Sequence, residues 1–395
     1  MDPRTNPYAP GAGTLPPELA GRDEIIEKAA IALDRFRAGL PARSLLLVGL
    51  RGVGKTVLLN KIALETENRG FIVVQIEAPE KRSLPALLIP SLRKALLQLD
   101  RLAHVGDHAK RALRALGGFV QGMKLKYQDI EFGLDLGIEP GVADTGDLEH
   151  DLADLLIAVG VAAQEKQTAI TFFIDELQYV AEEEFASLIT ALHRCAQKQL
   201  PVALIGAGLP QLVGQAGRAK SYAERLFEYP EIGPLTHEEG AKALTAPAVK
   251  HGVAFEPKAL TAILKKTECY PYFLQEWGKH SWLTAALSPI TLNDVEAATD
   301  LAISELDASF FRVRFDRLTP SEKRYLRAMA QLGAGPHRSG DIAKLLKKQV
   351  NEVAPVRAKL INKGMIYSRA HGDNSFTVPL FDQYMKRVMP TWDKS

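Results

Sequence analysis

A glycine-rich turn at residues 49–56, GLRGVGKT, constrains this 395-residue chain more than any other segment. It fits the complete pattern G-x-x-x-x-G-K-[ST]. An apolar run of strand length, SLLLVGL, leads into it, and a run with helical periodicity, VLLNKIALETEN, follows it. Gly49, Gly52 and Gly54 lack a Cβ, so the backbone can adopt positive φ and turn its N–H groups toward an anion. We therefore predict a phosphate-binding turn between a strand and a helix N-terminus.

The residues of this turn predict how a nucleoside triphosphate would be bound. Lys55 would contact the β- and γ-phosphates, and the Thr56 hydroxyl would bind Mg²⁺. The helix that starts near Thr56 adds the positive end of its dipole. The expected nucleotide-binding residues of the turn are Gly49, Arg51, Gly52, Val53, Gly54, Lys55, Thr56 and Val57.

An acidic pair farther along the chain predicts hydrolysis as well as binding. The apolar run AITFFI at residues 169–174 is typical of a buried strand and ends in Asp175 and Glu176. Asp175 is expected to bind Mg²⁺ through water, and Glu176 to orient and deprotonate the attacking water. Lys55 and Glu176 are therefore candidate catalytic residues of an ATPase.

Composition is that of a soluble globular protein, and we expect it to be cytoplasmic. Hydrophobic residues make up 46% of the sequence, but no apolar run approaches the roughly 18 residues that span a bilayer. The first 20 residues are polar and proline-rich, without the apolar core of a signal peptide. Cys195 and Cys269 are too few for a disulfide framework and lack the spacing of a metal site.

Strands that alternate with helices predict an α/β fold with a parallel sheet covered on both faces. Further strands are expected at 71–77 and 201–206. An insertion at about 83–146 follows the second strand, and alternation at 125–138 predicts a β-hairpin within it. The predicted parts are an extended arm at 1–20, a nucleotide-binding core at 21–235, a helical lid at 236–316 and a C-terminal domain at 317–395.

The C-terminal domain differs from the rest of the chain in charge. From Arg317 onward there are 15 Lys and Arg against 6 Asp and Glu, a local charge of +9, whereas the preceding residues carry 34 against 41, or −7. Helices predicted at 321–332, 339–347 and about 351–363, followed by a hairpin, indicate a winged helix-turn-helix. The basic residues expected to contact DNA phosphates are Arg357, Lys359, Lys363 and Arg369.

With these parts placed, the chain resembles the AAA+ ATPases of the origin-recognition and replication-initiator group over about residues 21–390. The resemblance implies a P-loop fold with a helical lid, and ATP and Mg²⁺ as cofactors. It also implies nucleotide contacts at Arg22, in the segment that packs on adenine, and at Pro271 of the lid. Residues 222–227, YAERLF, resemble the stretch that carries the family's arginine finger. Arg225 is then the implied catalytic finger, with Arg218 second, and a finger acting in trans implies a homo-oligomer.

Two features depart from the pattern of this family. A polar sensor residue commonly follows the fourth core strand, whereas this chain continues Gly206-Ala207-Gly208, so γ-phosphate sensing would fall to Gln211 or Gln178. The lid helix near Pro271 also lacks a sensor arginine. These departures imply slow hydrolysis, as in a nucleotide-controlled switch.

Two functions remain open from the sequence. In the first, an ATP-driven switch binds duplex DNA through its basic C-terminal domain. In the second, a signal-transduction-type ATPase uses that domain for protein contacts. A small-molecule kinase is disfavoured because the lid and C-terminal domain supply no evident acceptor pocket. No membrane partner is expected.

Overall fold

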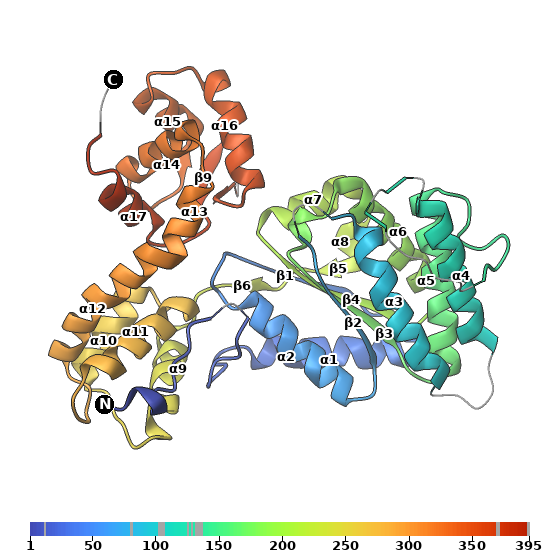
Figure 1. The fold of residues 1–395 in the computed structure, drawn as a ribbon, viewed down its shortest axis with the longest axis horizontal. Coiled ribbons are helices and arrows are strands. Elements are labelled where there is room, and N and C mark those ends of the chain that lie inside the picture. Colours follow the sequence, from blue (N-terminus) through green and yellow to red (C-terminus); the bar gives the residue numbers. More distant parts are fainter. Residues whose placement is uncertain are drawn as a thin grey trace. The chain divides into compact units, whose positions relative to one another are not determined.

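The computed structural model describes residues 1–11, 13–79, 82–101, 107–124, 126–127, 129–130, 137–368 and 372–392. The chain divides into two compact units (Figure 1). The sheet unit comprises residues 22–49 and 55–232, and the helical unit comprises residues 1–21, 50–54 and 233–395. Within these described ranges, no helix is long and apolar enough to cross a bilayer.

A parallel sheet forms the centre of the sheet unit, as the sequence predicts. Its strands are β1 (Ser44–Gly49), β2 (Ile72–Glu77), β3 (Ile170–Asp175), β4 (Val202–Gly208), β5 (Phe227–Glu228) and β6 (Glu231–Ile232). They follow the order β2-β3-β4-β1-β5, and β6 also pairs with β1. Every pairing is parallel, so the carboxyl ends of β1, β3 and β4 meet at one edge. Ligands of open α/β sheets bind at this edge.

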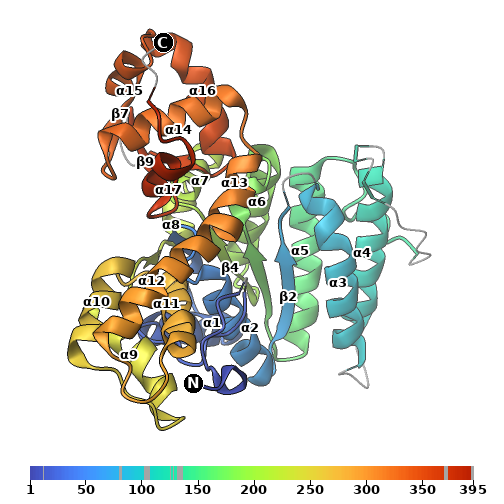
Figure 2. The ribbon, with the colours of Figure 1, turned by 60° about the vertical axis from the view of Figure 1, so that its left-hand side comes forward.

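Helices cover both faces of the sheet, because successive side chains of a strand point to opposite faces. Helices α1 (Asp23–Arg37) and α2 (Lys55–Asn68) lie on one face, and α5 (Leu148–Glu165) and α6 (Glu182–Gln197) on the other (Figure 2). The central strands β1, β3 and β4 are buried along their whole length. In β2, an edge strand, Gln75 and Glu77 are exposed.

Two further helices fill most of the segment between β2 and α5. They are α3 (Leu84–Arg101) and α4 (Asp107–Lys124), and both lie beside α5 (Figure 2). Apolar side chains one helical turn apart, such as Leu88, Leu92 and Leu96, join the core beneath β2. The hairpin predicted at 125–138 falls mainly on residues outside the described ranges, and none of the described residues there lies in a strand. Short elements complete the sheet unit: η2 (Leu177–Tyr179), α7 (Gln211–Ala219) and α8 (Ala223–Leu226).

The part of the helical unit that follows the sheet begins with four helices, which are α9 (His237–Val249), α10 (Pro257–Thr267), α11 (Pro271–Thr284) and α12 (Leu292–Leu306). Capping boxes at Thr236 and Thr291 start α9 and α12, because each hydroxyl accepts the N–H three residues on. A π-helical turn at Asp307–Phe311 connects α12 to α13 (Arg312–Asp316), so one helical run leads into the C-terminal part (Figure 1).

The C-terminal part contains the three predicted helices and a small antiparallel sheet. The helices are α14 (Pro320–Leu332), α15 (Ser339–Leu345) and α16 (Val350–Asn362). The sheet has the order β7-β9-β8, with β7 (His337–Arg338), β8 (Ile366–Tyr367) and β9 (Asp373–Phe376). Strand β7 and a last helix, α17 (Phe381–Val388), lie outside the predicted elements. Helix α17 is too short for its apolar period to be clear in the sequence.

The N-terminal arm packs along the helical unit. The Asn6 side-chain amide donates to the Lys279 carbonyl at 3.1 Å, and the Trp282 indole donates to the Asp2 carbonyl at 3.0 Å. Tyr8 is buried, and its hydroxyl donates to the Leu244 carbonyl. Its ring lies against Gly278 in α11, where an added Cβ would meet ring carbons at 2.7–2.9 Å. Gly278 is therefore required by close packing.

We predict that Gly278→Ala lowers the free energy of unfolding by about 1–3 kcal/mol, the usual cost of overpacking. Helix propensity alone would have the opposite effect on stability, because alanine normally stabilises a helix interior by about 0.5–1 kcal/mol relative to glycine. Urea denaturation followed by tryptophan fluorescence measures it, since Trp277, Trp282 and Trp392 all belong to the helical unit. Gly340→Ala, whose Cβ would have no neighbour within 4 Å, is the control and should not destabilise. Equal stability of Gly278→Ala and wild type would refute the packing argument.

Candidate functional site

The glycine-rich turn leaves β1 at Gly49 and enters α2 at Lys55. Gly52 and Gly54 have φ of +82° and +89°, in the region that favours glycine. Gly49 was expected to need the same freedom, but it is the last residue of β1, pairs with Ile232, and does not have a positive φ. Its extended conformation continues the strand, so two glycines rather than three shape the turn.

Residues 50–54 pack within the helical unit against the start of α11. The Tyr272 N–H donates to the Gly52 carbonyl at 3.2 Å, and a Cβ at Gly52 would lie 3.4 Å from Tyr270 and from Tyr272. Pro271 is the first residue of α11 and immediately precedes this contact. The Arg51 N–H donates to the Thr377 carbonyl at 3.3 Å. Two backbone groups of the turn thus have partners in the helical unit.

Thr56 and Asp175, the two expected Mg²⁺ ligands, meet in the sheet unit. The Thr56 hydroxyl donates to Asp175 Oδ2 at 2.6 Å, which joins the first turn of α2 to the carboxyl end of β3. Lys55 and Asp175 are both buried, with 8% and 7% exposure. Burial raises the pKa of Asp175, whereas the Thr56 hydrogen bond and the nearby Lys55 charge lower it in part. A bound cation would compensate this desolvation.

Glu176 and Gln178 extend the site from β3 toward β4. Glu176 has a left-handed backbone with φ of +53°, and its N–H donates to Asp175 Oδ1 at 2.8 Å. The Gln178 side-chain amide donates to Glu176 Oε2, and its carbonyl oxygen accepts the Leu209 N–H at 3.0 Å. Gln178 therefore bridges the Glu176 carboxylate and the backbone that follows β4.

This bridge explains the glycines at the end of β4. A Cβ at Gly208 would lie 2.8 Å from the Gln178 carbonyl oxygen, and a Cβ at Gly206 would lie 2.2 Å from Leu177. Side chains of η2 thus fill the space that a polar side chain on β4 would otherwise occupy. Gln211 has a buried side-chain oxygen with no hydrogen-bond partner among the described residues. Of the two glutamines that the sequence leaves open, Gln178 is the one bonded to Glu176.

Residues 18–205 match the AAA ATPase domain. The phosphate loop, β1, β2, β3 and nearly all of β4 lie within this match. Residues 308–385, which include α14, α15 and α16, match a domain of unknown function.

One curated protein and two solved structures are similar to most of this chain. An uncharacterised HTH-type transcriptional regulator of Methanocaldococcus jannaschii is 22% identical over 346 residues, which cover 84% of this chain and 79% of that protein. A Walker-type ATPase of Pyrococcus abyssi has a similar structure, with a TM-score of 0.58 and 16% identity over 93% of this chain and 96% of its own. The ORC2 protein of Aeropyrum pernix gives a TM-score of 0.52, with 14% identity over 96% and 98% of the two chains. At these identities, the two solved structures show a shared fold alone.

The remaining predicted nucleotide-binding residues and the two candidate finger arginines differ in burial. Arg22 is buried just before α1, Val53 is buried, and Val57 is half-buried in α2. Arg225 is exposed on α8 and forms no ion pair with any described residue. Arg218, the alternative finger, is 3.4 Å from Glu182 in an ion pair. Both arginines are therefore exposed, and they differ in that Arg218 has a surface ion-pair partner.

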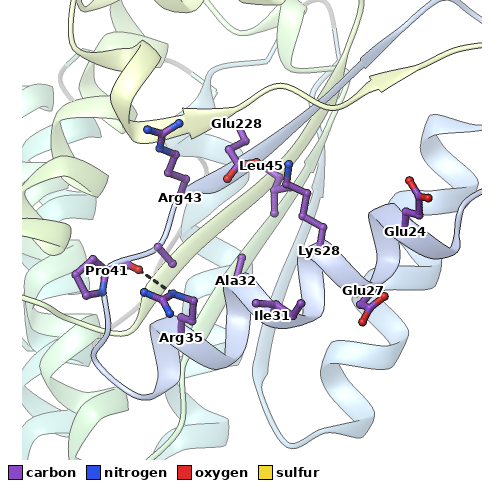
Figure 3. A pocket seen from close by; sticks show the side chains of 11 residues that line it. Glu24, Glu27, Lys28, Ile31, Ala32, Arg35, Pro41, Arg43, Leu45 and Glu228 are labelled. Carbon is purple, nitrogen blue, oxygen red and sulfur yellow. Dashed lines mark hydrogen bonds and ion pairs between the residues drawn. The ribbon is translucent and has the colours of Figure 1, made fainter.

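A groove of about 500 Å³ in the sheet unit contains none of the expected site residues (Figure 3). It lies between α1 and the start of β1, at Arg43 and Leu45, which is opposite to the carboxyl edge of the sheet. Lys28 forms an ion pair with Glu228 there, and Arg35 donates to the Pro41 carbonyl at 3.0 Å (Figure 3). Three of its charged side chains, Lys28, Arg35 and Glu228, thus already have partners.

Two of the basic residues expected to face DNA are used inside the C-terminal part. The Arg357 guanidinium donates to Asn374 Oδ1 at 2.7 Å, and the Lys363 ammonium donates to Glu322 Oε2 at 2.7 Å. Both side chains are therefore half-buried and bonded within this part of the chain, and their contact with DNA stays a prediction. Lys359 is exposed as expected, and Arg369 lies outside the described residues.

Other exposed lysines lie on α15 and in the turn between α15 and α16. They are Lys344, Lys347 and Lys348. They are absent from the predicted DNA contacts, which all lie on the third helix or the wing. Three lysines within five residues at a helix–turn–helix junction were the signal available in the sequence.

We predict that Gln178→Ala lowers the kcat of ATP hydrolysis at least about tenfold and leaves KM unchanged. The reason is that Glu176, as general base, would lose the amide that orients it, and general bases contribute about 10²–10⁴ in rate. Steady-state phosphate release measures both constants. Gln211→Ala is the matched control and should retain activity, and Gln178→Glu should not restore it because two carboxylates repel. An unchanged kcat in Gln178→Ala would leave Gln178 a purely structural bridge.

Proposed function

We propose that this protein is a slow, Mg²⁺-dependent ATPase that acts as a nucleotide-controlled switch and binds duplex DNA through its C-terminal part. The proposal that the protein binds and hydrolyses ATP rests on the hydrogen bond of 2.6 Å between Thr56 and Asp175. This hydrogen bond brings two oxygen atoms together next to the phosphate-binding turn, and oxygen is the ligand that Mg²⁺ prefers. The match to the AAA ATPase domain supports the same conclusion.

Each residue has a separate role in the proposed reaction. The N–H groups of residues 51–56 and the Lys55 ammonium would bind the phosphates, and Arg22 and Pro271 would contact the nucleotide. Thr56 and Asp175 would hold Mg²⁺, which neutralises phosphate charge when bound. Glu176 would accept a proton from the attacking water. Gln178 would hold the Glu176 carboxylate and, being a neutral amide, would add no charge at the γ-phosphate.

We predict that Lys55→Ala loses ATP binding, whereas Glu176→Gln binds ATP and loses turnover. Removing Lys55 removes a positive charge from the β- and γ-phosphates. The glutamine in Glu176→Gln keeps the shape of the side chain but cannot accept the proton of water. Isothermal titration calorimetry with ATP and Mg²⁺ measures binding, and phosphate release measures turnover. Lys61→Ala, at a half-buried lysine later in α2, is the control for Lys55. Turnover of Glu176→Gln at the wild-type rate would remove Glu176 from catalysis.

The same Glu176→Gln variant tests the proposed finger in trans. Arg225→Ala should bind ATP normally and hydrolyse it about 10³–10⁵-fold more slowly, the usual contribution of an arginine finger. A mixed oligomer can combine an intact Glu176 from one subunit with an intact Arg225 from another, so mixing the two variants should restore part of the activity. Mixed oligomers without any recovery would argue against a homo-oligomeric active site.

The DNA half of the proposal rests on the arrangement and charge of the C-terminal part. Three helices and a small antiparallel sheet, with β7 between α14 and α15 and with β8 and β9 after α16, are the elements of a winged helix-turn-helix. Helix α16 would be the recognition helix. Lys347 and Lys348 precede α16, and Lys359 lies on it; all three are exposed. The local charge of +9 and the helix-turn-helix regulator among the relatives support this assignment.

A second candidate function follows from the internal hydrogen bonds of Arg357 and Lys363. These hydrogen bonds leave fewer free basic side chains on and next to α16 than the sequence predicts. In addition, Val350, an apolar residue at the start of α16, is exposed. A surface of this kind also suits protein contacts. The alternative is therefore a signal-transduction-type ATPase whose C-terminal part binds a protein.

Substitution of the exposed lysines distinguishes these two functions. The triple variant Lys347→Ala, Lys348→Ala, Lys359→Ala should flatten the salt dependence of duplex DNA affinity by about two to three units of slope, because each phosphate contact contributes about 0.9. Fluorescence anisotropy across a salt series measures the slope. ATP binding should stay unchanged.

The matched control removes the same charge from α10 and from the residue that follows α9 in the same unit. Lys250→Ala, Lys258→Ala, Lys265→Ala replaces three other exposed lysines and should retain the wild-type slope. Arg357 and Lys363 are left intact, since their loss would disturb internal hydrogen bonds. If wild type binds no duplex at low salt, or if both triple variants behave alike, the protein-binding alternative is favoured.

A further inference from the structure

Three potential ligand atoms meet between α11 and α12, which lie side by side in the helical unit (Figures 1 and 2). Glu276 and His280 are four residues apart on α11, so their side chains share one face of the helix. Glu305 comes from α12. His280 Nε2 is 3.7 Å from Glu276 Oε2 and 3.1 Å from Glu305 Oε2, and all three atoms lie within 4.8 Å of one another.

The inner two of these side chains are buried without hydrogen-bond partners at the facing atoms. Glu276 is 3% exposed and His280 is 7% exposed. Neither Glu276 Oε2 nor His280 Nε2 makes a hydrogen bond of good geometry with any described residue, although both lie within ion-pair distance of a neighbour. A buried carboxylate oxygen and a buried imidazole nitrogen whose hydrogen-bonding capacity is not met are costly in a protein interior.

Two neighbouring side chains, Lys279 and Tyr272, also contact the carboxylates of this cluster. The Lys279 ammonium donates to Glu305 Oε1 at 2.7 Å, which leaves Oε2 facing His280. The Tyr272 hydroxyl is a hydrogen-bond partner of the Glu276 carboxylate. Lys279 supplies one positive charge against two carboxylates, so the cluster keeps an excess of acidic groups that favours a cation.

We propose that Glu276, His280 and Glu305 form a binding site for a zinc-class divalent transition-metal ion. One imidazole and two carboxylates are a ligand set that zinc accepts, with a water completing four-coordination. Mg²⁺ and Ca²⁺ are disfavoured because they prefer oxygen ligands alone. Bound metal would cross-link α11 and α12. This site is separate from the proposed nucleotide site and does not depend on it.

Cobalt(II) is the probe, since its visible absorption reports ligand number and geometry in zinc sites. Nucleotide-free full-length protein should bind one equivalent of Co²⁺, and Zn²⁺ should displace it. His280→Gln and Glu305→Gln should each weaken Co²⁺ binding by more than about tenfold, because loss of a ligand costs at least as much as loss of an outer-shell partner. Circular dichroism verifies that the variants fold, and Glu305 is the safer substitution because its side chain is 44% exposed.

Two control variants separate this site from other metal-binding groups. His237→Gln and Glu296→Gln remove an exposed histidine and an exposed glutamate of the same helical unit, and both should bind Co²⁺ as wild type does. Asp175→Asn should also retain the cobalt spectrum, which excludes the Thr56–Asp175 site as its source. The proposal is overturned if wild type binds no cobalt at millimolar concentration. It is also overturned if folded His280→Gln and Glu305→Gln both bind it like wild type.

Discussion

The hydrogen bond from Thr56 to Asp175 is the contact on which the candidate site depends. It joins the helix that follows the phosphate-binding turn to the end of β3, two segments that are 119 residues apart in the sequence. The parallel order β3-β4-β1 makes this meeting possible, because it brings the carboxyl ends of non-consecutive strands to one edge. Strand β4 lies between them, so its last residues must leave room for whatever acts on the nucleotide.

The arrangement at the end of β4 follows from this constraint. Gly206 and Gly208 have no side chains, and Leu177 and Gln178 reach in from η2. The left-handed backbone of Glu176 turns the chain so that Gln178 can bond both to the Glu176 carboxylate and to the Leu209 N–H. The polar side chain bonded to Glu176 therefore comes from η2, which follows β3, and not from β4.

The parts of this structure that the sequence predicts are those whose chemistry is local. The phosphate-binding turn needs Gly52 and Gly54 for its backbone, and β3 is an uninterrupted apolar run that ends in Asp175. The partners of Arg357 and Lys363 could not be predicted in this way, because Asn374 and Glu322 lie on other elements and only the fold brings them close. The cluster of Glu276, His280 and Glu305 could not be predicted for the same reason, because its members belong to two helices.

The shared space between Gln178 and Gly208 has a consequence for the evolution of this family of sequences. A Cβ at Gly208 would meet the ends of the Gln178 and Leu212 side chains, so in a relative with a polar side chain at the position of Gly208 these neighbours must shift or be smaller. A change at one of these positions therefore favours a compensating change at another. We expect the residues at these three positions to vary together among related sequences.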